Sequence, residues 1–213
     1  MSKVICIAGE SGSGKTTSME KLNPKETYYI DCDKKGLSWK GWKNQYNKEN
    51  KNYYVTDFPN DVETLIKGIN EKRPEIKYIV IDTLNGIMIG DEMRRAKEKG
   101  YDKWMDLATS VWNIVDSAYT YRDDLTIIFV CHTQTERTDD GFSFTRIKTS
   151  GKKLDKITLE SKFTTVLLAK AIDGNYIFET KANKSTAKTP KGAFEKDFIP
   201  NDITLVIEAL KNY

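Results

Sequence analysis

A glycine-rich octapeptide near the amino terminus constrains this chain more than any other feature. Residues 9–16 read GESGSGKT and match the pattern G-x-x-x-x-G-K-[ST]. The octapeptide follows a short apolar run, residues 3–8, and precedes a segment that we expect to begin a helix. Glycines let a backbone wrap a phosphate with several N–H groups pointing inward, and a helix N-terminus adds partial positive charge. The pattern therefore predicts a loop that holds the phosphates of a nucleoside triphosphate.

Separate roles are predicted for the residues of this loop. Lys15 would reach the β- and γ-phosphates of ATP, and the Thr16 hydroxyl would ligate Mg²⁺. A second apolar run, residues 78–81, ends in Asp82, whose carboxylate would hold the same Mg²⁺ at the carboxyl edge of a sheet. We therefore assign Thr16 and Asp82 to the metal, and Lys15 and Asp82 to catalysis. The predicted nucleotide-binding residues are Gly9, Glu10, Ser11, Gly12, Ser13, Gly14, Lys15, Thr16 and Thr17.

Short apolar runs that alternate with helical patterns indicate the fold class. Runs rich in Val, Ile, Tyr and Phe are typical of buried strands in a parallel sheet. They occupy residues 3–8, 27–30, 78–81 and 126–131. Apolar residues at helical spacing within residues 62–69 and 104–119 predict helices that cover the sheet. The first two thirds of the chain therefore predict an α/β fold with a mostly parallel sheet flanked by helices.

The last third of the chain has a different pattern. Residues 164–170 and 175–180 flank Asp173-Gly174, which predicts an antiparallel hairpin that extends the sheet. A closing helix is expected from about Asp202. We expect residues 1–213 to form a single domain.

Three long segments lack a core pattern, and such segments in a compact domain are usually functional or disordered. They are residues 34–52, 85–101 and 135–157.

Composition excludes several classes of protein. Thirty-four Lys+Arg and 31 Asp+Glu give a net charge of +3, so only local clusters of charge bear on a nucleic-acid partner. Three cysteines and one histidine at wide spacing do not predict a disulfide framework or a zinc site. No apolar run is long enough to cross a bilayer, and no signal peptide is indicated. We expect a cytoplasmic protein with no membrane partner.

The order of these motifs resembles the RecA-like ATPase core. More closely, it resembles the short phage-type proteins grouped with single-strand-annealing recombination proteins, the Sak-type AAA-domain family. The resemblance implies a RecA-like P-loop NTPase sheet, Mg²⁺-dependent ATP hydrolysis stimulated by DNA, and binding of single-stranded DNA in recombination or strand annealing. It also implies a homo-oligomer with the nucleotide near the subunit interface, in the host cytoplasm if the protein is phage-encoded. The segments that carry the likeness are residues 9–17, 29–36, 79–84, 129–134, 151–154 and 187–190.

The same resemblance assigns roles to residues outside the loop. Asp33 falls where RecA-like enzymes keep a catalytic glutamate that polarises the attacking water, with Glu10 and Asp31 as alternatives. His132 falls where those proteins place the polar residue that senses the γ-phosphate and couples it to the DNA-binding loop. A basic residue near the end of the core would reach a neighbouring subunit's nucleotide, and the two candidates are Lys184 and Lys188.

Two segments combine positive charge with aromatic residues. Residues 141–156 place Phe142 and Phe144 beside a basic cluster, a combination that suits single strands because these expose both phosphates and bases. The predicted DNA-binding residues are Arg146, Lys148, Lys152, Lys153 and Lys156. The other segment, residues 34–51, interleaves lysines with Trp39, Trp42 and Tyr46. Its aromatic rings would stack on adenine, stack on DNA bases, or pack as a lid on the core.

Two other classes of protein use the same phosphate-binding loop. A nucleotide or small-molecule kinase commonly closes several arginines over the phosphates, whereas this chain has no arginine cluster suited to such a lid. A helicase or helicase-loader motor is the other alternative.

Overall fold

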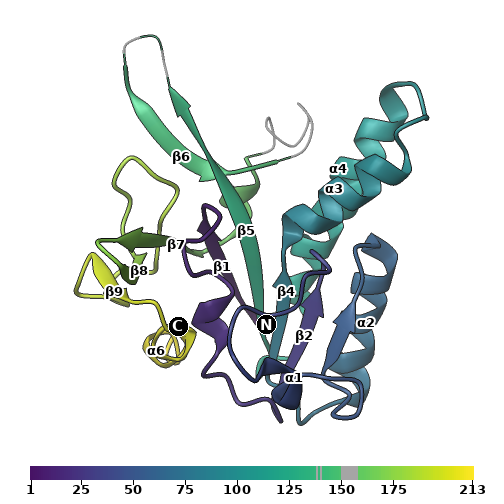
Figure 1. Ribbon diagram of the computed structural model, residues 1–213, viewed down its shortest axis with the longest axis horizontal. Helices are drawn as coiled ribbons and strands as arrows, with labels where there is room; N and C mark the ends of the chain where they lie inside the picture. The colour runs from purple at the N-terminus through teal and green to yellow at the C-terminus, as the bar shows by residue number, and fades with distance from the viewer. Residues whose placement is uncertain (138, 140, 150–157) are drawn as a thin grey trace.

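A mostly parallel sheet forms the centre of the protein, and the computed structural model describes residues 1–137, 139, 141–149 and 158–213 (Figure 1). Its strands are β1 (Lys3–Gly9), β2 (Thr27–Asp31), β3 (Tyr53–Val55), β4 (Tyr78–Asp82), β5 (Thr126–Arg137), β6 (Ser143–Ile147), β7 (Thr165–Ile172), β8 (Asn175–Glu179) and β9 (Phe198–Pro200). They lie in the order β3-β2-β4-β5-β1-β7-β8-β9, and β6 pairs with the outer half of β5. Strands β3 to β7 in this order are parallel, while β8 and β9 run antiparallel.

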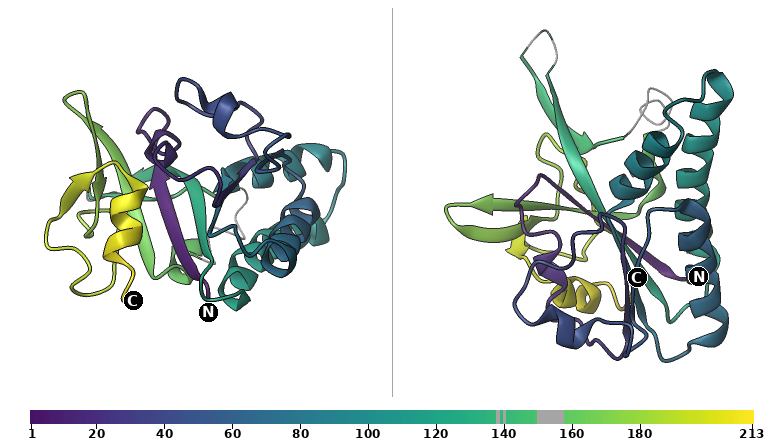
Figure 2. Two further views of the ribbon diagram at one scale, coloured as in Figure 1. Left: turned by 90° about the horizontal axis from the view of Figure 1, so that it is seen from below. Right: turned by 45° about the vertical axis from the view of Figure 1, so that its right-hand side comes forward.

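Helices cover both faces of the sheet (Figure 2). They are α1 (Trp42–Gln45), α2 (Pro59–Lys72), α3 (Leu84–Arg94), α4 (Tyr101–Ser117) and α6 (Ile203–Ala209), with short 3₁₀ turns η1 (Thr17–Met19), η2 (Ala118–Thr120) and η3 (Leu159–Lys162). Helices α2, α3 and α4 share one apolar cluster, and η1 and α6 contribute to the other. Strand β1 serves both clusters because its side chains alternate, with Val4 and Cys6 on one side and Ile5 and Ile7 on the other.

The predicted fold class is confirmed. The four predicted strands all form, and each lies in the parallel part of the sheet. The predicted hairpin is β7–β8, and its turn places Asp173 and Gly174 at φ 49° and 78°. The closing helix α6 begins after Asp202, whose carboxylate accepts a hydrogen bond from the backbone N–H of Thr204. The chain therefore has an α/β fold with a mostly parallel sheet and an antiparallel C-terminal extension.

The prediction of a helix after the phosphate-binding loop is wrong. Only the single turn η1 forms there, with Ser18 N–H donating to the carbonyl of Gly14. The chain then passes through Asn23-Pro24 and enters β2 at Thr27. Because proline disfavours helical backbone at the residue before it, the short connection leaves little room for a longer helix.

The segments without a core pattern contain more regular structure than we expected. Within residues 85–101, most of α3 forms, and Leu84, Ile87 and Met88 bury one face of it. Within residues 135–157, the end of β5 and the whole of β6 form an antiparallel ribbon (Figure 1). Residues 34–52 contain α1, and the rings of Trp39 and Tyr46 are buried against the core. For these two rings the lid interpretation is therefore supported.

The antiparallel pair β5–β6, which we call the ribbon (residues 133–137 and 143–147), projects beyond the parallel sheet (Figure 1). Cross-strand partners include Thr135 opposite Thr145 and Gln134 opposite Arg146. Both faces of the ribbon carry polar residues, so it lacks the alternation of a half-buried strand. Among the described residues, no helix has the length and apolarity needed to span a membrane.

Candidate nucleotide-binding site

The glycine-rich loop lies at the carboxyl end of β1, between that strand and η1. Gly12 and Gly14 have φ angles of 79° and 87°, which side-chain-bearing residues rarely adopt. At Gly9, an added Cβ would lie 2.5 Å from Ser13 Oγ and 2.7 Å from the carbonyl oxygen of Ala169. The three glycines therefore allow the tight loop that the sequence predicts.

Lys15 is folded back onto its own loop. Its ammonium donates to the carbonyl oxygens of Gly9 at 2.9 Å and Glu10 at 2.6 Å, and the residue is only 6% exposed. Burial lowers the pKa of Lys15, although Asp82 acts in the opposite direction. Carbonyl oxygens are weaker partners for an ammonium than phosphate oxygens are. A phosphate entering the loop can thus replace these internal acceptors.

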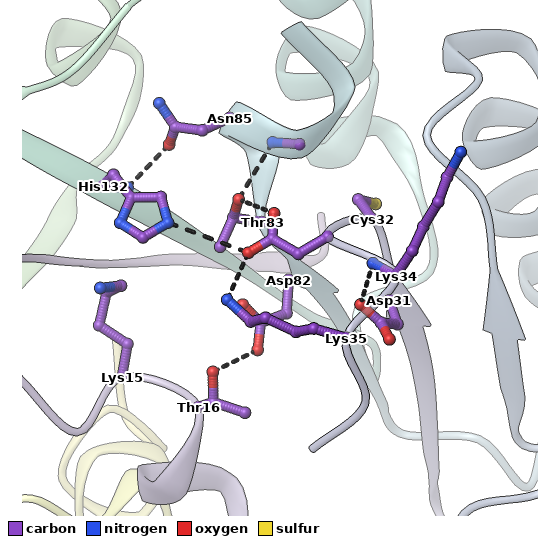
Figure 3. Close-up of polar contacts among 12 residues, drawn as sticks. Lys15, Thr16, Asp31, Cys32, Lys34, Lys35, Asp82, Thr83, Asn85 and His132 are labelled. Carbon is purple, nitrogen blue, oxygen red and sulfur yellow. Dashed lines mark hydrogen bonds and ion pairs between the residues drawn. The ribbon is translucent and has the colours of Figure 1, made fainter. Parts of the chain in front are cut away.

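Thr16 and Asp82 meet as the metal assignment requires (Figure 3). The Thr16 hydroxyl donates to Asp82 Oδ2 at 2.7 Å, and the hydroxyl of Tyr29 donates to the same oxygen at 2.5 Å. Asp82 is 2% exposed, and its other oxygen, Oδ1, is buried without a hydrogen-bond partner in the described part of the chain. Burial raises the pKa of Asp82 in spite of the two hydroxyl donors.

The geometry around Asp82 fits a magnesium ion. An orphaned, buried carboxylate oxygen beside a threonine hydroxyl offers the hard oxygen ligands that Mg²⁺ prefers. The described residues contain no cluster of three or more His, Cys, Asp or Glu side chains that could enclose a metal alone. Mg²⁺ usually takes one or two protein ligands together with substrate phosphates, so Thr16 and Asp82 suffice for such a site.

Asp33 is the common partner of a second group of polar side chains, of which Figure 3 labels Lys35, Thr83 and His132. Its Oδ1 accepts from the Thr83 hydroxyl at 2.7 Å, and its Oδ2 accepts from Lys35 Nζ at 2.6 Å. His132 Nε2 lies 3.9 Å from the same Oδ2. Burial would raise the pKa of Asp33, but hydrogen bonds from His132, Lys35 and Thr83 outweigh it and lower that pKa well below its usual range. Asp33 is therefore ionised at neutral pH and lies within reach of His132.

The two alternatives to Asp33 have different surroundings. Asp31 is 2% exposed, and it accepts from the backbone N–H groups of Lys34 and Gly36 at 2.8 Å each and from Tyr53 Oη at 2.7 Å. These bonds hold the turn after β2, where Lys34 has a φ of 60°. Glu10 is exposed on the glycine-rich loop, beside the cleft that borders it. Asp31 thus serves the turn, whereas Asp33 lies close to His132 and Glu10 lines the cleft beside the loop.

Asn85 is a residue of the site that sequence reasoning missed. Its side chain is 2% exposed, accepts from the backbone N–H of His132 at 2.7 Å, and donates to the carbonyl oxygen of Lys148 at 2.7 Å. The first turn of α3 is thereby tied both to His132 and to the end of the ribbon. The only signal in the sequence is a polar residue three positions after Asp82, at the start of a helix.

A cleft of about 280 Å³ borders the glycine-rich loop on its β7 side. Ser13 and Thr133 line it, and their hydroxyls are buried without a hydrogen-bond partner among the described residues. Thr145 of the ribbon and Lys170 of β7 also line it, and Lys170 pairs with the buried carboxylate of Glu179. The free hydroxyls add polar groups beside the loop. Three further predicted loop residues, Glu10, Ser11 and Gly12, line this cleft. Thr17 follows Thr16 beyond the cleft, and its Oγ1 lies 2.9 Å from Ser38 Oγ.

The predicted DNA-binding residues are only partly placed. Arg146 lies on β6, where it pairs with Glu136 at 3.4 Å and Glu160 at 3.6 Å. Lys148 is exposed just beyond β6, and its backbone N–H donates to the carbonyl of His132 at 2.8 Å. Lys152, Lys153 and Lys156 lie outside the described residues. The structure therefore connects Lys148 directly to the His132 strand.

The two lysines predicted to act across subunits lie away from this chain's own loop. Lys184 is exposed, and its carbonyl oxygen accepts from the backbone N–H of Thr145. Lys188 pairs through its backbone with Val166 of β7 and lines a cleft on the other side of the ribbon.

Comparisons with known proteins agree with this geometry. Residues 1–193 match a protein family described as an AAA domain. No curated protein sequence matches this one. Among solved structures, a KaiC-like protein from the hyperthermophilic archaeon Pyrococcus horikoshii OT3 gives a TM-score of 0.40 at 13% identity, covering 83% of this chain and 76% of its own. The P4 protein from bacteriophage phi6, in complex with ADP, gives 0.43 at 11% identity, covering 84% of this chain and 55% of its own. Since the family match spans most of the sequence, the chain belongs to the AAA domain family of P-loop ATPases.

Proposed function

We propose that this protein binds ATP with Mg²⁺ and hydrolyses it at the site formed by the glycine-rich loop, Asp82 and Asp33. The observation that carries the proposal is the hydrogen bond of 2.7 Å between Thr16 and Asp82, which joins the two metal-binding residues next to Lys15. Lys15 would exchange its two carbonyl partners for the β- and γ-phosphates. When bound, Mg²⁺ supplies charge that stabilises the transferring phosphoryl group.

We assign Asp33 to orient the attacking water. Its low pKa keeps the carboxylate ionised, so it can accept a hydrogen bond from water. Lys35 and His132 hold its Oδ2 from one side, which fixes the direction in which that oxygen faces. We assign His132 to sense the γ-phosphate, because its backbone N–H is tied to Asn85 and its carbonyl to Lys148.

We further propose that the protein binds single-stranded DNA, as the resemblance to single-strand-annealing recombination proteins implies. Arg146 and Lys148 lie on and just beyond the ribbon, and Lys148 adjoins the predicted segment with three more lysines. The hydrogen bond from Lys148 N–H to the carbonyl of His132 gives a direct connection between the nucleotide site and this segment. Such a connection would make ATP and DNA binding reciprocal, provided both ligands favour one arrangement of the ribbon.

We also propose that residues 1–213 act as one unit within a homo-oligomer. Helix α6 near the carboxyl terminus packs in the same apolar cluster as β1 near the amino terminus. Lys184 is exposed on the segment beside Thr145 of the ribbon, so it is available to a neighbouring subunit's nucleotide.

The test measures ATP hydrolysis alone, with single-stranded DNA, with double-stranded DNA, and with nucleoside monophosphates. We expect stimulation by single strands only. In Lys15→Ala, hydrolysis should fall by about two to three orders of magnitude, because a preorganised charge at the phosphates is lost. Near-normal turnover in Lys15→Ala would refute the loop assignment. ADP formation that depends on a monophosphate and ignores DNA would instead identify a kinase.

A further inference from the structure

The ribbon has a second cleft on the face away from the glycine-rich loop. Side chains of β6 alternate, so Thr145 lines the cleft beside the loop, while Phe144 and Arg146 line the second one. The second cleft has a volume of about 490 Å³. Its opposite wall is formed by η3 and by residues that follow β8, including Glu160, Thr186 and Lys188. None of these wall residues takes part in the nucleotide site.

Glu160 is the unusual residue of this cleft. It is 4% exposed, and its Oε1 accepts from the backbone N–H of Ile147 at 2.8 Å. Its Oε2 is buried without a hydrogen-bond partner among the described residues, and the same holds for the hydroxyl of Thr186. A buried carboxylate oxygen without a donor is energetically costly, so a native structure usually supplies a partner from a ligand or water.

The charge around Glu160 favours a neutral donor over a cation. Arg146 Nε lies 3.6 Å from Glu160 Oε1, and its NH1 lies 3.4 Å from Glu136 Oε1. Lys188 also lines the cleft, so two cations already balance the two carboxylates. An incoming ammonium or guanidinium would meet this arginine. An uncharged amino group would satisfy Oε2 without that repulsion.

Resting on the proposed binding of single-stranded DNA, we propose that this cleft holds one base that carries an exocyclic amino group. The amino group donates to Glu160 Oε2, as carboxylates accept from cytosine N4 in nucleic-acid recognition. The ring of Phe144, on the cleft wall, stacks on the base, and Lys188 contacts a phosphate of the strand. Thymine fits less well, because its single edge donor, N3–H, lies between two carbonyl oxygens that would approach the carboxylate.

Binding of short homopolymers tests this assignment. Fluorescence anisotropy with oligo-dC, oligo-dA and oligo-dT of about ten nucleotides gives the Kd of each at one salt concentration. We expect oligo-dC and oligo-dA to bind roughly tenfold more tightly than oligo-dT, the size of one hydrogen bond to a charged group.

Glu160→Gln should abolish the preference. The amide oxygen of the glutamine keeps the bond from Ile147 N–H, so its NH₂ group takes the place of Oε2 and presents donors where an acceptor was. The ratio of the oligo-dT and oligo-dC Kd values should therefore fall about tenfold or more. Glu136→Gln is the matched control on the same face, where the exposed carboxylate leaves the ratio unchanged. Phe144→Ala should weaken all three oligonucleotides by about tenfold.

Three other results would overturn the inference, and each points to a different explanation. Tight binding of all three homopolymers to the unaltered protein with equal Kd values refutes the base site and leaves the proposed function intact. Failure to bind any of them refutes the proposed binding of single-stranded DNA, on which the base site rests. If Glu160→Gln leaves DNA binding unchanged but alters the oligomer size in light scattering, the cleft holds a basic side chain of another protein chain instead.

Discussion

The nucleotide site and the second cleft of the ribbon differ in how the oxygens of their carboxylates are partnered. At the nucleotide site, Asp82 and Asp33 are enclosed by hydroxyls, an imidazole and lysine, and of their four carboxylate oxygens only Asp82 Oδ1 lacks a partner among the described residues. In the second cleft, Arg146 pairs with exposed Glu136, and Oε2 of the buried Glu160 has no hydrogen-bond partner among the described residues. Ligand binding at the first site would thus exchange the carbonyl partners of Lys15 and also add a partner to Asp82 Oδ1, whereas binding at the second would only add a missing partner. The first arrangement suits catalysis, and the second suits selection among bases.

The largest effect expected in this comparison comes from Asp82→Asn. Removing the carboxylate should lower Mg²⁺-dependent hydrolysis about a thousandfold, because the metal loses its charged protein ligand. Stability should respond in the opposite sense. Burial raises the pKa of Asp82, so its ionised form disfavours the folded state, and stability is lost as pH rises through that pKa. The variant should therefore unfold at an equal or higher temperature than the unaltered protein at neutral pH without metal.

Tyr29→Phe is the matched control for this variant. It keeps the carboxylate and removes only the hydroxyl that donates to Asp82 Oδ2. We expect a smaller loss of hydrolysis, about tenfold, as for other groups that orient a metal ligand. If Asp82→Asn retains Mg²⁺-dependent hydrolysis near the normal rate, the metal assignment is wrong.

A smaller effect separates the carboxylates that follow β2. Asp33→Asn should reduce hydrolysis about a hundredfold while leaving ATP binding intact, because it removes the group that orients water. Asp31→Asn should leave the rate per folded molecule nearly unchanged and lower the free energy of unfolding by about 1–3 kcal/mol. The reason is that Asp31 accepts from two backbone N–H groups of the turn. Steady-state hydrolysis and urea unfolding of both variants give the comparison.

The dependence of the unfolding free energy on acidic pH also distinguishes Asp33 from Asp31. The folded-state pKa of Asp33 lies below the unfolded value near 3.9, so its contribution is complete above that pH and is lost as pH falls toward the folded value. Asp33→Asn should flatten the fall in unfolding free energy below about pH 4. Loss of hydrolysis in Asp31→Asn with unchanged stability would transfer the water-orienting role to Asp31.

The grouping of the candidate nucleotide-site residues was predictable because these residues are either contiguous or fixed by sheet geometry. The loop of residues 9–16 is one stretch of sequence. Asp82 and Asp33 lie at or just beyond the carboxyl ends of β4 and β2, and His132 lies where the parallel pairing of β5 with β1 ends. Carboxyl ends of parallel strands meet at one edge, so sequence order alone predicts their proximity. Asn85 escaped this reasoning because its role depends on the ribbon, whose strands pair across residues 133 and 147.

Sequence patterns failed at two places: they did not predict the ribbon, and they predicted a helix after the loop that does not form. The ribbon carries polar residues on both faces, so no period of two in hydrophobicity reveals it. The loop motif usually precedes a helix, but here Asn23-Pro24 lies close behind it and β2 follows. The local motif thus agrees with the tight glycine loop that forms, but it predicted the next element wrongly, because chain length between two strands is a tertiary constraint.

The smallest expected effect concerns the charge next to the ribbon. Lys148 contributes its backbone to His132 and Asn85, while its side chain is exposed, so Lys148→Gln removes one cation and keeps both backbone bonds. The slope of log affinity against log salt for single-stranded DNA should become shallower by about 0.7, with DNA-free ATP hydrolysis unchanged. Lys67→Gln, at an exposed position on α2, is the control and should leave the slope unaltered. The same measurement on Lys152→Gln and Lys153→Gln extends the test to the adjoining segment. Equal slopes in all of these variants would place the DNA phosphates on another surface. That result would leave the assignment of the nucleotide site unaffected.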